Sequence, residues 1–303
     1  MDKRTYIPNT IEDFVSHEGE GLFAFPLHAD IELSSRCNLN CVFCDKQHLL
    51  QPGQLGDMDE ELFRSIVDQC VAGGAESIGL SYRGEPLLTR HAAEMGAYAK
   101  GVGIGHVSFC TNGMLLTPVV AEKLIAAGLD ELTVSAQGAT AESFECSRLG
   151  SNFAAVLRNV EALMAKKKKL GADKPRLRIQ AVAVPELDRE SFVEFWTPRC
   201  DEVVIVPYRP PCEGTVRDSS WCCSQLWRRM TVEWDGLILP CNNNDGRASS
   251  PGNAREMSLA EAWTSPEVNA LRTLHQMGRG GEAADCSICT FRAAALAMEL
   301  FGC

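Results

Sequence analysis

The sequence predicts an α/β fold, a partial (β/α)6 TIM-like barrel followed by a small C-terminal domain that contains a β-hairpin and helices. Short apolar runs alternate about six times with amphipathic helical segments, the pattern of a parallel sheet covered by helices. This alternation stops after Pro210-Pro211, and the following residues 230–239 have the pattern of a hairpin turning at Asp235-Gly236. We therefore expect an N-terminal extension over residues 1–26, a barrel over residues 27–211 and a second domain over residues 212–303.

The individual elements follow from apolar periodicity and from residues that start or stop helices. Asp59 is an expected N-cap, Pro118 lies in a first helical turn, and Gly73-Gly74 and Gly128 follow helix ends. The expected strands cover residues 29–33, 77–80, 106–109, 132–134, 177–184 and 203–206. The expected helices cover residues 59–72, 90–100, 117–127, 153–168, 191–196, 258–277 and 290–301. In such barrels, functional side chains follow the carboxyl ends of the strands.

Composition narrows the range of functions. The net charge of −11 argues against binding to nucleic acid, because that binding depends on neutralising phosphates. No run approaches the roughly 18 apolar residues of a membrane span, and the N-terminus lacks the apolar core of a signal peptide. We therefore expect a cytoplasmic protein with no membrane partner. Such a compartment keeps thiols reduced, so the 14 cysteines are expected to bind metal wherever their spacing allows it.

The first cysteine set, Cys37, Cys41 and Cys44, forms a CxxxCxxC loop directly after the first expected strand. Three thiolates leave one iron of a [4Fe–4S] cluster without a protein ligand, whereas a structural zinc ion takes four ligands. The loop, with Phe43 before its last cysteine, resembles the signature of the radical S-adenosyl-L-methionine (SAM) superfamily. This resemblance implies that the open iron binds the amino and carboxylate groups of SAM. Cleavage of SAM then yields a 5′-deoxyadenosyl radical that takes a hydrogen atom from the substrate.

Further motifs follow the later strands in the order typical of this superfamily. The segment Tyr82-Arg83-Gly84-Glu85-Pro86 resembles its GGEP motif, with Arg83 in place of one of the two glycines. By this resemblance, Gly84 and Glu85 meet the SAM amino group. The resemblance also implies SAM contacts from Phe43, from Asn112 in a Thr111-Asn112-Gly113 turn, from Ser135 and Gln137 beside the ribose, and from Arg148 on the carboxylate.

The second cysteine set lies in the expected C-terminal domain. Twelve residues, Gly236 and four more residues separate Cys223 from Cys241, and Cys286 and Cys289 form a CxxC. This pattern resembles the twitch domain, a shortened SPASM domain, and implies one auxiliary [4Fe–4S] cluster with four protein ligands. Cys222 competes with Cys223 for the first position, and the twitch spacing favours Cys223. A zinc ribbon is the alternative for these four residues alone.

The cysteine spacings and the chain size are similar to those of 2-deoxy-scyllo-inosamine dehydrogenase, a twitch enzyme. This resemblance implies oxidation of a secondary alcohol of an aminocyclitol or amino sugar in natural-product biosynthesis, with the auxiliary cluster accepting an electron. Arg209, which follows the sixth strand, is the expected residue for orienting the substrate hydroxyl. A small molecule is the expected substrate, and a flavodoxin or ferredoxin is the expected reductant.

Three alternatives stay open at this point. A sugar or peptide epimerase returns a hydrogen atom from a cysteine, for which Cys146, Cys212 and Cys222 are candidates. Modification of a ribosomally synthesised peptide (a RiPP) is the second alternative, weakened by the lack of an evident N-terminal peptide-recognition domain. A non-enzymatic iron–sulfur or zinc-binding module is the third, and the three-ligand loop together with the SAM motifs argues against it.

Overall fold

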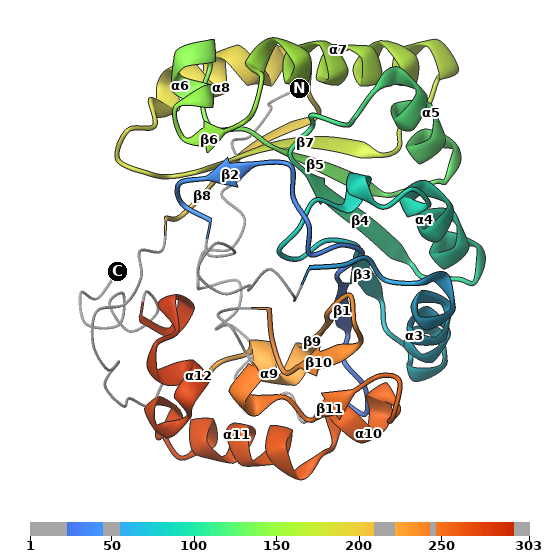
Figure 1. The fold of residues 1–303 in the computed structure, drawn as a ribbon, viewed down its shortest axis with the longest axis vertical. Helices are drawn as coiled ribbons and strands as arrows, with labels where there is room; N and C mark the ends of the chain where they lie inside the picture. Colours follow the sequence, from blue (N-terminus) through green and yellow to red (C-terminus); the bar gives the residue numbers. More distant parts are fainter. Residues whose placement is uncertain (1–22, 45–54, 209–221, 243–246, 294–303) are drawn as a thin grey trace.

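The computed structural model describes residues 23–44, 55–208, 222–242 and 247–293 of the 303-residue chain. Arg209, Cys212 and the expected domain boundary at residues 211–212 lie outside these ranges, as do most of the expected N-terminal extension and terminal helix. Within the described residues, a nine-stranded sheet curves through the molecule, and helices cover its outer side (Figure 1).

Six parallel strands form the barrel part of this sheet, and neighbours in the sheet follow one another along the chain. They are β1 (His28–Ile31), β3 (Ser77–Gly79), β4 (His106–Thr111), β5 (Glu131–Ser135), β7 (Arg176–Val182) and β8 (Glu202–Val206). Each strand pairs in parallel with the next. The predicted partial α/β barrel is therefore confirmed, with strand ends that differ from expectation by one or two residues.

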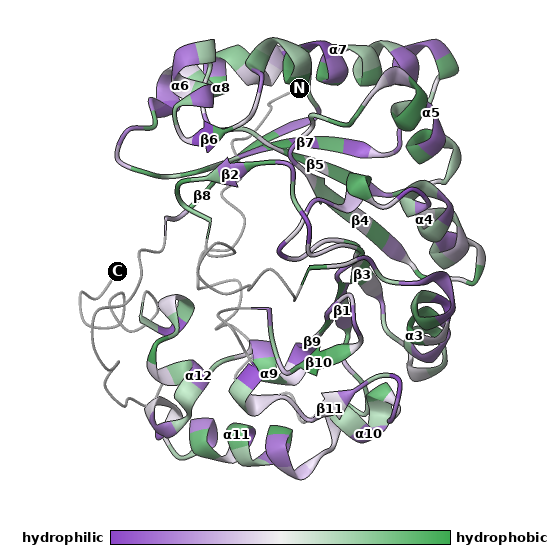
Figure 2. Cartoon of the chain, in the orientation of Figure 1, coloured by the Kyte–Doolittle hydropathy of each residue, from purple (hydrophilic) through white to green (hydrophobic). Residues whose placement is uncertain are grey.

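Helices connect these strands, as the alternating sequence pattern predicts. They are α3 (Glu60–Gly73), α4 (Ala92–Gly101), α5 (Pro118–Ala126), α6 (Ala141–Glu145), α7 (Phe153–Leu170) and α8 (Arg189–Trp196). The side chains of Asp59 and Thr117 cap α3 and α5, and Gly74 ends α3 in the left-handed conformation. Hydrophobic and hydrophilic residues alternate along the helices (Figure 2), and their apolar residues join the core against the sheet.

The strands separate the apolar core from a polar interior. In β4, Val107 and Phe109 belong to the hydrophobic core, whereas Ser108 and Cys110 line a cavity on the opposite face. This separation follows from the two-residue period of a strand, which points successive side chains to opposite faces. Strands β1 and β7 alternate in the same way. Polar side chains from neighbouring strands therefore converge inside the curved sheet.

The C-terminal region extends the same sheet. Strand β9 (Arg229–Val232) pairs in parallel with β1, and it forms the expected hairpin with β10 (Leu237–Leu239), to which the short β11 (Gly252–Asn253) is added. Gly236 adopts a φ of 96° at the hairpin turn, a conformation that favours glycine. The sequence predicts a hairpin in a domain separate from the barrel. In the structure the hairpin is instead part of the barrel sheet, because β9 pairs with the otherwise unpaired edge of β1.

The remaining helices of the described C-terminal region are short. They are α9 (Gln225–Arg228), α10 (Leu259–Trp263), α11 (Pro266–Gln276) and α12 (Ala284–Ser287). The single helix expected over residues 258–277 is divided into α10 and α11. Pro266 accounts for the division, because proline cannot donate a helical hydrogen bond and favours the first turn. Ser265 caps the second helix by accepting from the Val268 amide.

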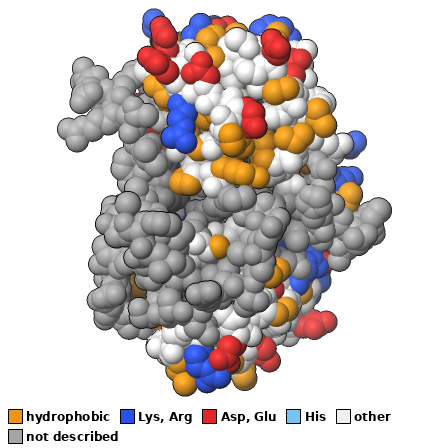
Figure 3. Space-filling view, turned by 90° about the vertical axis from the view of Figure 1, so that its left-hand side faces the viewer, with side chains coloured by type: hydrophobic (Ala, Val, Ile, Leu, Met, Phe, Trp, Pro, Cys, Tyr) orange, Lys and Arg blue, Asp and Glu red, His pale blue; other side chains and the backbone are white. Residues whose placement is uncertain are grey.

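None of the described helices is both long enough and apolar enough to cross a bilayer. Hydrophobic side chains gather in the upper half of the face shown in Figure 3, and acidic and basic side chains lie at its top and bottom. Val42 and Tyr208 are among the exposed apolar side chains, at 63% and 37% exposure. Both residues line a cavity that is described below with the cysteine loop.

Asp130, directly before β5, is a structural anchor of the barrel. It accepts hydrogen bonds from Lys100 Nζ (2.7 Å), the Val107 amide (2.8 Å) and Lys174 Nζ (2.5 Å). Burial alone would raise the pKa of this carboxyl, but these hydrogen bonds lower it from 3.8 to about 2. A carboxyl group whose pKa is lower in the folded protein than in the unfolded chain stabilises the fold at pH values above the pKa of the unfolded chain. This contribution is lost as the pH falls toward 2.

We predict that Asp130→Asn lowers the stability at neutral pH by about 2 kcal/mol, because the bonded charge is removed. The thermal unfolding midpoint of the holoprotein should fall by about 5 °C. Asp173→Asn, at an exposed carboxylate in the loop between α7 and β7, is the control and should change the midpoint by less than about 1 °C. Equal midpoints for the two variants would contradict the anchoring role.

Candidate active site

The first cysteine loop is held against the segment between α6 and α7. Residues Asn40–Cys41 form β2, which pairs in antiparallel fashion with β6 (Arg148–Leu149), so that Cys41 lies opposite Arg148. The Val42 amide also donates to the Ser147 carbonyl at 2.9 Å. The sequence did not predict this two-stranded pairing, which brings the expected SAM-carboxylate residue to the cysteine loop from about 100 residues away.

The three thiols of this loop lie within electrostatic range of one another and of one guanidinium. Burial raises the pKa of Cys41, Arg148 opposes this effect, and Cys44 and Cys37 raise the pKa further. Thiolates brought together beside a guanidinium suit a metal centre that binds sulfur ligands. Among the described residues, no three His, Cys, Asp or Glu side chains meet closely enough to hold a single metal ion. A cluster of four irons places its ligands farther apart than one ion does.

Arg148 combines burial with an unused donor. Its side chain packs with the guanidinium carbon 5.7 Å from the Phe43 ring centroid and 5.8 Å from that of Phe144. Its Nε is buried and has no hydrogen-bond partner among the described residues. A buried guanidinium N–H without an acceptor is costly unless a ligand supplies one. The residue therefore fits an acidic group that binds beside the three cysteines.

The GGEP-like loop is tied to the loops after β1 and β4. Glu85 is buried and accepts from the Thr111 hydroxyl (2.7 Å), the Asn112 amide (2.7 Å) and the Leu87 amide (3.1 Å). A carboxylate has about four acceptor positions, so about one remains for a ligand. Burial raises the pKa of Glu85, and these hydrogen bonds oppose the shift. The Asn112 side chain donates to Asn38 Oδ1 at 2.7 Å, within the cysteine loop.

Gly84 has no space for a side chain. A Cβ at this position would lie 1.9 Å from the carbonyl oxygen of Ser34 and 2.6 Å from that of Arg36. Glycine is therefore required here by the close approach of two backbone segments. This contact places the GGEP-like loop directly against the start of the cysteine loop.

Ser135 is the last residue of β5 and Gln137 follows it, and both side chains already have partners. The Gln137 side-chain amide donates to the Val182 carbonyl (2.6 Å) and accepts from the Val182 amide (3.1 Å), which joins the ends of β5 and β7. Ser135 Oγ lies 3.4 Å from Cys110 Sγ. Gln137 therefore contributes to the arrangement of the strand ends, whereas Ser135 keeps a hydroxyl close to the interior.

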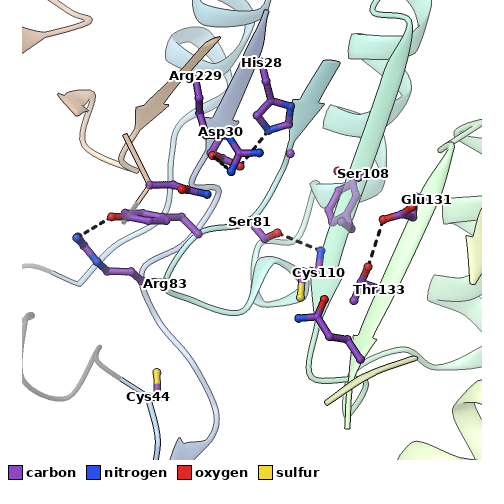
Figure 4. A pocket seen from close by; sticks show the side chains of 15 residues that line it. His28, Asp30, Cys44, Ser81, Arg83, Ser108, Cys110, Glu131, Thr133 and Arg229 are labelled. Atoms are coloured by element: carbon purple, nitrogen blue, oxygen red, sulfur yellow. Dashed lines mark hydrogen bonds and ion pairs between the residues drawn. The ribbon is translucent and has the colours of Figure 1, made fainter. Parts of the chain in front are cut away.

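A polar cavity of about 480 Å³ lies inside the curved sheet (Figure 4). Cys44 lies toward one end of it, and His28, Asp30 and Arg229 meet toward the other (Figure 4). Burial would raise the pKa of Asp30, but Arg229 and His28 lower it. The other polar side chains around the cavity come mostly from successive strands and are Ser81, Tyr82, Arg83, Ser108, Cys110, Glu131, Thr133, Gln180 and Asn242.

A second cavity of about 480 Å³ lies beside the cysteine loop. Val42 and Phe43 of the loop line it, together with Gln137 and Tyr208 from the ends of strands. Cys146, one of the expected hydrogen-donor candidates, also lines this cavity and is outside the polar interior. The two cavities therefore meet the loop through different residues, Cys44 in one and Val42 and Phe43 in the other.

The second cysteine set is brought together from four distant positions. Burial raises the pKa of Cys223, and the neighbouring Cys241, Cys289 and Cys286 raise it further. Burial is the cause that raises the pKa of Cys222, with no contribution from the other cysteines. The geometry therefore favours Cys223 over Cys222 as a member of the set.

Sequence reasoning missed His275, which lies beside this second set. His275 is buried in α11, with Nε2 3.3 Å from Cys286 Sγ and Nδ1 3.4 Å from the Cys223 amide. It thus contacts two members of the set through its two ring nitrogens. The available signal was weak, since a single histidine near the end of a helix is ordinary in sequence. Cys110, which belongs to neither cysteine motif, likewise lies in the polar cavity.

Comparison with known proteins agrees with both cysteine motifs. Residues 31–195 match the Radical SAM superfamily, and residues 222–290 match SPASM, an iron–sulfur cluster-binding domain. The first match alone covers more than half of the chain. The chain belongs to the radical SAM superfamily. SAM and [4Fe–4S] clusters, including an auxiliary cluster, are therefore its cofactors, and as a radical SAM enzyme it acts on a substrate and needs a reductant.

Several curated proteins are similar to part or most of this chain. An AdoMet-dependent heme synthase of Methanosarcina barkeri is 35% identical over 44% of the chain and 37% of its own length. The mycofactocin maturase MftC of Mycobacterium ulcerans is 34% identical over 53% of the chain and 41% of its own length. The chain thus spans less than half of these two relatives. A tungsten-containing aldehyde ferredoxin oxidoreductase cofactor-modifying protein of Pyrococcus furiosus is 24% identical over 85% of the chain and 86% of its own length.

Solved structures share the fold. A crystal structure of BtrN in complex with AdoMet and 2-DOIA has a TM-score of 0.59 and 17% identity, covering 89% of this chain and 94% of BtrN. Streptococcus suis SuiB, bound to the precursor peptide SuiA, has a TM-score of 0.68 and 17% identity, covering 83% of this chain and 68% of SuiB. At this identity the similarity establishes the architecture of barrel and C-terminal region, and the substrate of this chain is a separate question.

We predict that the anaerobically reconstituted protein holds about eight iron and eight sulfide per chain, because each cysteine set suits one [4Fe–4S] cluster. Joint replacement of Cys37, Cys41 and Cys44 by alanine should leave about four of each. Cys70→Ala is the control, since Cys70 is buried in α3 and burial alone raises its pKa, to about 12. Iron and sulfide assays check this, and a triple variant with undiminished iron would contradict the assignment.

Proposed function

We propose that this chain oxidises a secondary alcohol of a small polyhydroxylated amine, an aminocyclitol or amino sugar, in natural-product biosynthesis. The observation that carries the proposal is the polar cavity of about 480 Å³ that reaches Cys44. Hydroxyl, amide, carboxylate and guanidinium groups line it, and such groups recognise a compact polar molecule. The similarity to BtrN, whose structure was solved in complex with AdoMet and 2-DOIA, supports the same function. The match covers 94% of the BtrN chain.

The chain's own residues supply the SAM site in this proposal. Cys37, Cys41 and Cys44 hold the first cluster, which together with SAM supplies the 5′-deoxyadenosyl radical for hydrogen abstraction. Arg148 offers its unpartnered Nε to the SAM carboxylate, and Glu85 offers its remaining acceptor position to the amino group. Backbone groups around Phe43 and Gly84, the Asn112 side chain and the hydroxyl of Ser135 complete the proposed contacts, while Gln137 positions the strand ends.

The interior of the cavity offers a route for the proton that leaves an oxidised alcohol. Loss of a hydrogen atom, a proton and an electron converts a secondary alcohol into a ketone. His28 Nε2 lies 3.1 Å from Asp30 Oδ1, and His28 Nδ1 lies 2.8 Å from Ser77 Oγ. This pair can take up a proton within the cavity, and the carboxylates of Asp30 and Glu131 favour an amine substrate. The orienting role expected for Arg209 stays a prediction, because Arg209 lies outside the described residues.

The electron that leaves the substrate has a nearby acceptor in this proposal. Tyr82 and Asn242 line the cavity, and the Tyr82 pKa is raised by burial and also by Cys241 of the second cysteine set. The auxiliary cluster held by Cys223, Cys241, Cys286 and Cys289 would thus lie near the cavity wall. A flavodoxin or ferredoxin in the cytoplasm is the proposed external reductant.

Epimerisation is the second candidate function, and Cys110 is the observation that favours it. Its thiol lines the cavity beside Ser135, at 3.4 Å between Sγ and Oγ, where it can return a hydrogen atom to a substrate radical. Among the earlier cysteine candidates, Cys146 lines the other cavity and Cys212 lies outside the described residues. Likeness to a mycofactocin maturase and to peptide-bound SuiB supports peptide modification as a third reading.

Mass spectrometry of products from candidate aminocyclitols and amino sugars tests the proposal. Oxidation lowers the product mass by two hydrogens, with no deuterium gained from D₂O. An epimer made in D₂O carries one deuterium and keeps its other atoms, and Cys110→Ala should abolish its formation. If the protein converts a precursor peptide and converts none of the small polar substrates, peptide modification replaces the proposal.

We predict that Cys223→Ala keeps uncoupled formation of 5′-deoxyadenosine within about fivefold of wild type and loses at least about 90% of product, because the first cluster is intact and the electron acceptor is not. Cys70→Ala is the matched control and should keep both activities. Chromatographic quantification of 5′-deoxyadenosine and product measures the ratio. Normal product formation by Cys223→Ala would show that the auxiliary cluster accepts no electron.

A further inference from the structure

A buried ion pair joins the GGEP-like loop to the hairpin of β9 and β10. Arg83 Nη1 contacts Glu233 Oε1, and the two side chains are only 7% and 1% exposed. Arg247 pairs with the other oxygen of Glu233 through Nη2. The residue numbers differ by 150, so the contact links segments that are remote in sequence. One of these segments lies at the proposed SAM site, and the other carries Cys241 a few residues further on.

A second carboxylate joins the backbones of the same two segments. Glu32, directly after β1, is 1% exposed and accepts from the Arg83 amide (3.1 Å) and from the Trp234 amide (3.4 Å). Burial and the neighbouring Glu233 raise the pKa of Glu32 to about 7, and Arg83 opposes the shift. Two buried carboxylates lie near each other here, and the Arg83 guanidinium offsets their repulsion.

The same guanidinium reaches the wall of the polar cavity. Arg83 Nη2 donates to the Tyr82 hydroxyl at 2.8 Å, and the guanidinium carbon lies 4.4 Å from the Tyr82 ring centroid. Figure 4 shows Arg83 beside this cavity, with Cys44 on the same side of the view. Arginine is suited to such multiple contacts, because its planar fork donates in several fixed directions.

We propose that Arg83 is a positioning residue that fixes the Cys241-bearing hairpin against the proposed SAM-binding loop. It thereby sets where the auxiliary cluster lies relative to the cavity. The GGEP-like motif has Arg83 where the resemblance expects glycine, and the adjacent Gly84 has no space for any side chain. The extra side chain therefore serves a contact that a glycine at position 83 cannot make. This inference holds for any substrate and does not depend on the proposed alcohol oxidation.

Hydrogen exchange of the holoprotein, followed by mass spectrometry, tests the inference with Arg83→Gln. Amides of residues 229–241 should exchange at least about tenfold faster than in wild type, because the hairpin loses a buried tie. The matched control is Arg64→Gln, since Arg64 also pairs with a glutamate (Glu60) and lies 4.2 Å from a tyrosine ring (Tyr98), but on the exposed face of α3. That control should leave exchange over 229–241 unchanged.

A spectroscopic readout separates positioning of the hairpin from damage to the SAM loop. The electron paramagnetic resonance signal of the auxiliary cluster is the one that SAM does not alter. This signal should change in the reduced Arg83→Gln variant. The SAM-dependent signal of the first cluster should persist. Unchanged exchange over 229–241, or a change confined to loss of the SAM-dependent signal, would overturn the inference.

Arg83→Lys keeps the test decisive if the glutamine variant does not accumulate. Lysine retains one charge but lacks the fork that binds Glu233 and Tyr82 together. Exchange over residues 229–241 that is faster by about twofold to tenfold supports the positioning role. Wild-type exchange in this variant overturns it.

Discussion

Strand β1 is hydrogen-bonded in parallel on both edges, to β3 on one side and to β9 on the other, and the rest of the structure depends on this pairing. It anchors the start of the cysteine loop, which follows directly. The GGEP-like loop follows β3, and the hairpin that leads to Cys241 begins with β9. Parallel pairing of β1 with β3 therefore places the first cysteine loop and the GGEP-like loop at the carboxyl ends of neighbouring strands, where ligands bind in parallel α/β folds. Strand β10 runs back antiparallel to β9, so that Cys241 follows it toward the start of β9.

The polar cavity results from the same strand geometry. Residues that face the helices are apolar and packed, and their immediate neighbours in sequence face inward and are polar. Polar groups in a protein interior are stable when they bond to one another. The Arg178–Glu131 pair meets this requirement within the protein, and His28 and Arg229 contact the two carboxylate oxygens of Asp30. Arg148 is buried beside the three cysteines, and its Nε has no hydrogen-bond partner among the described residues, which leaves that donor for a ligand.

Local signals account for what could be predicted from the sequence. The six strands, the cap at Asp59, the first helical turn at Pro118 and the turn at Gly236 each depend on a few adjacent residues, and both cysteine motifs are local spacings. Contacts between distant segments could not be predicted in this way. The pairing of β2 with β6, the addition of β9 to β1 and the approach of His275 to the second cysteine set arise only when the chain closes on itself. The partners of Gln137 and Cys110 likewise depend on the neighbouring strands.

The parallel pairing of β1 with β9 has a consequence for how the protein forms during synthesis. His28 lies opposite Arg229, so the partners are about 200 residues apart along the chain. One edge of β1 thus has no backbone partner until these later residues have been synthesised and β9 has docked. An unpaired strand edge invites association with other chains. Docking of β9 therefore both completes the sheet beside β1 and removes this site of association.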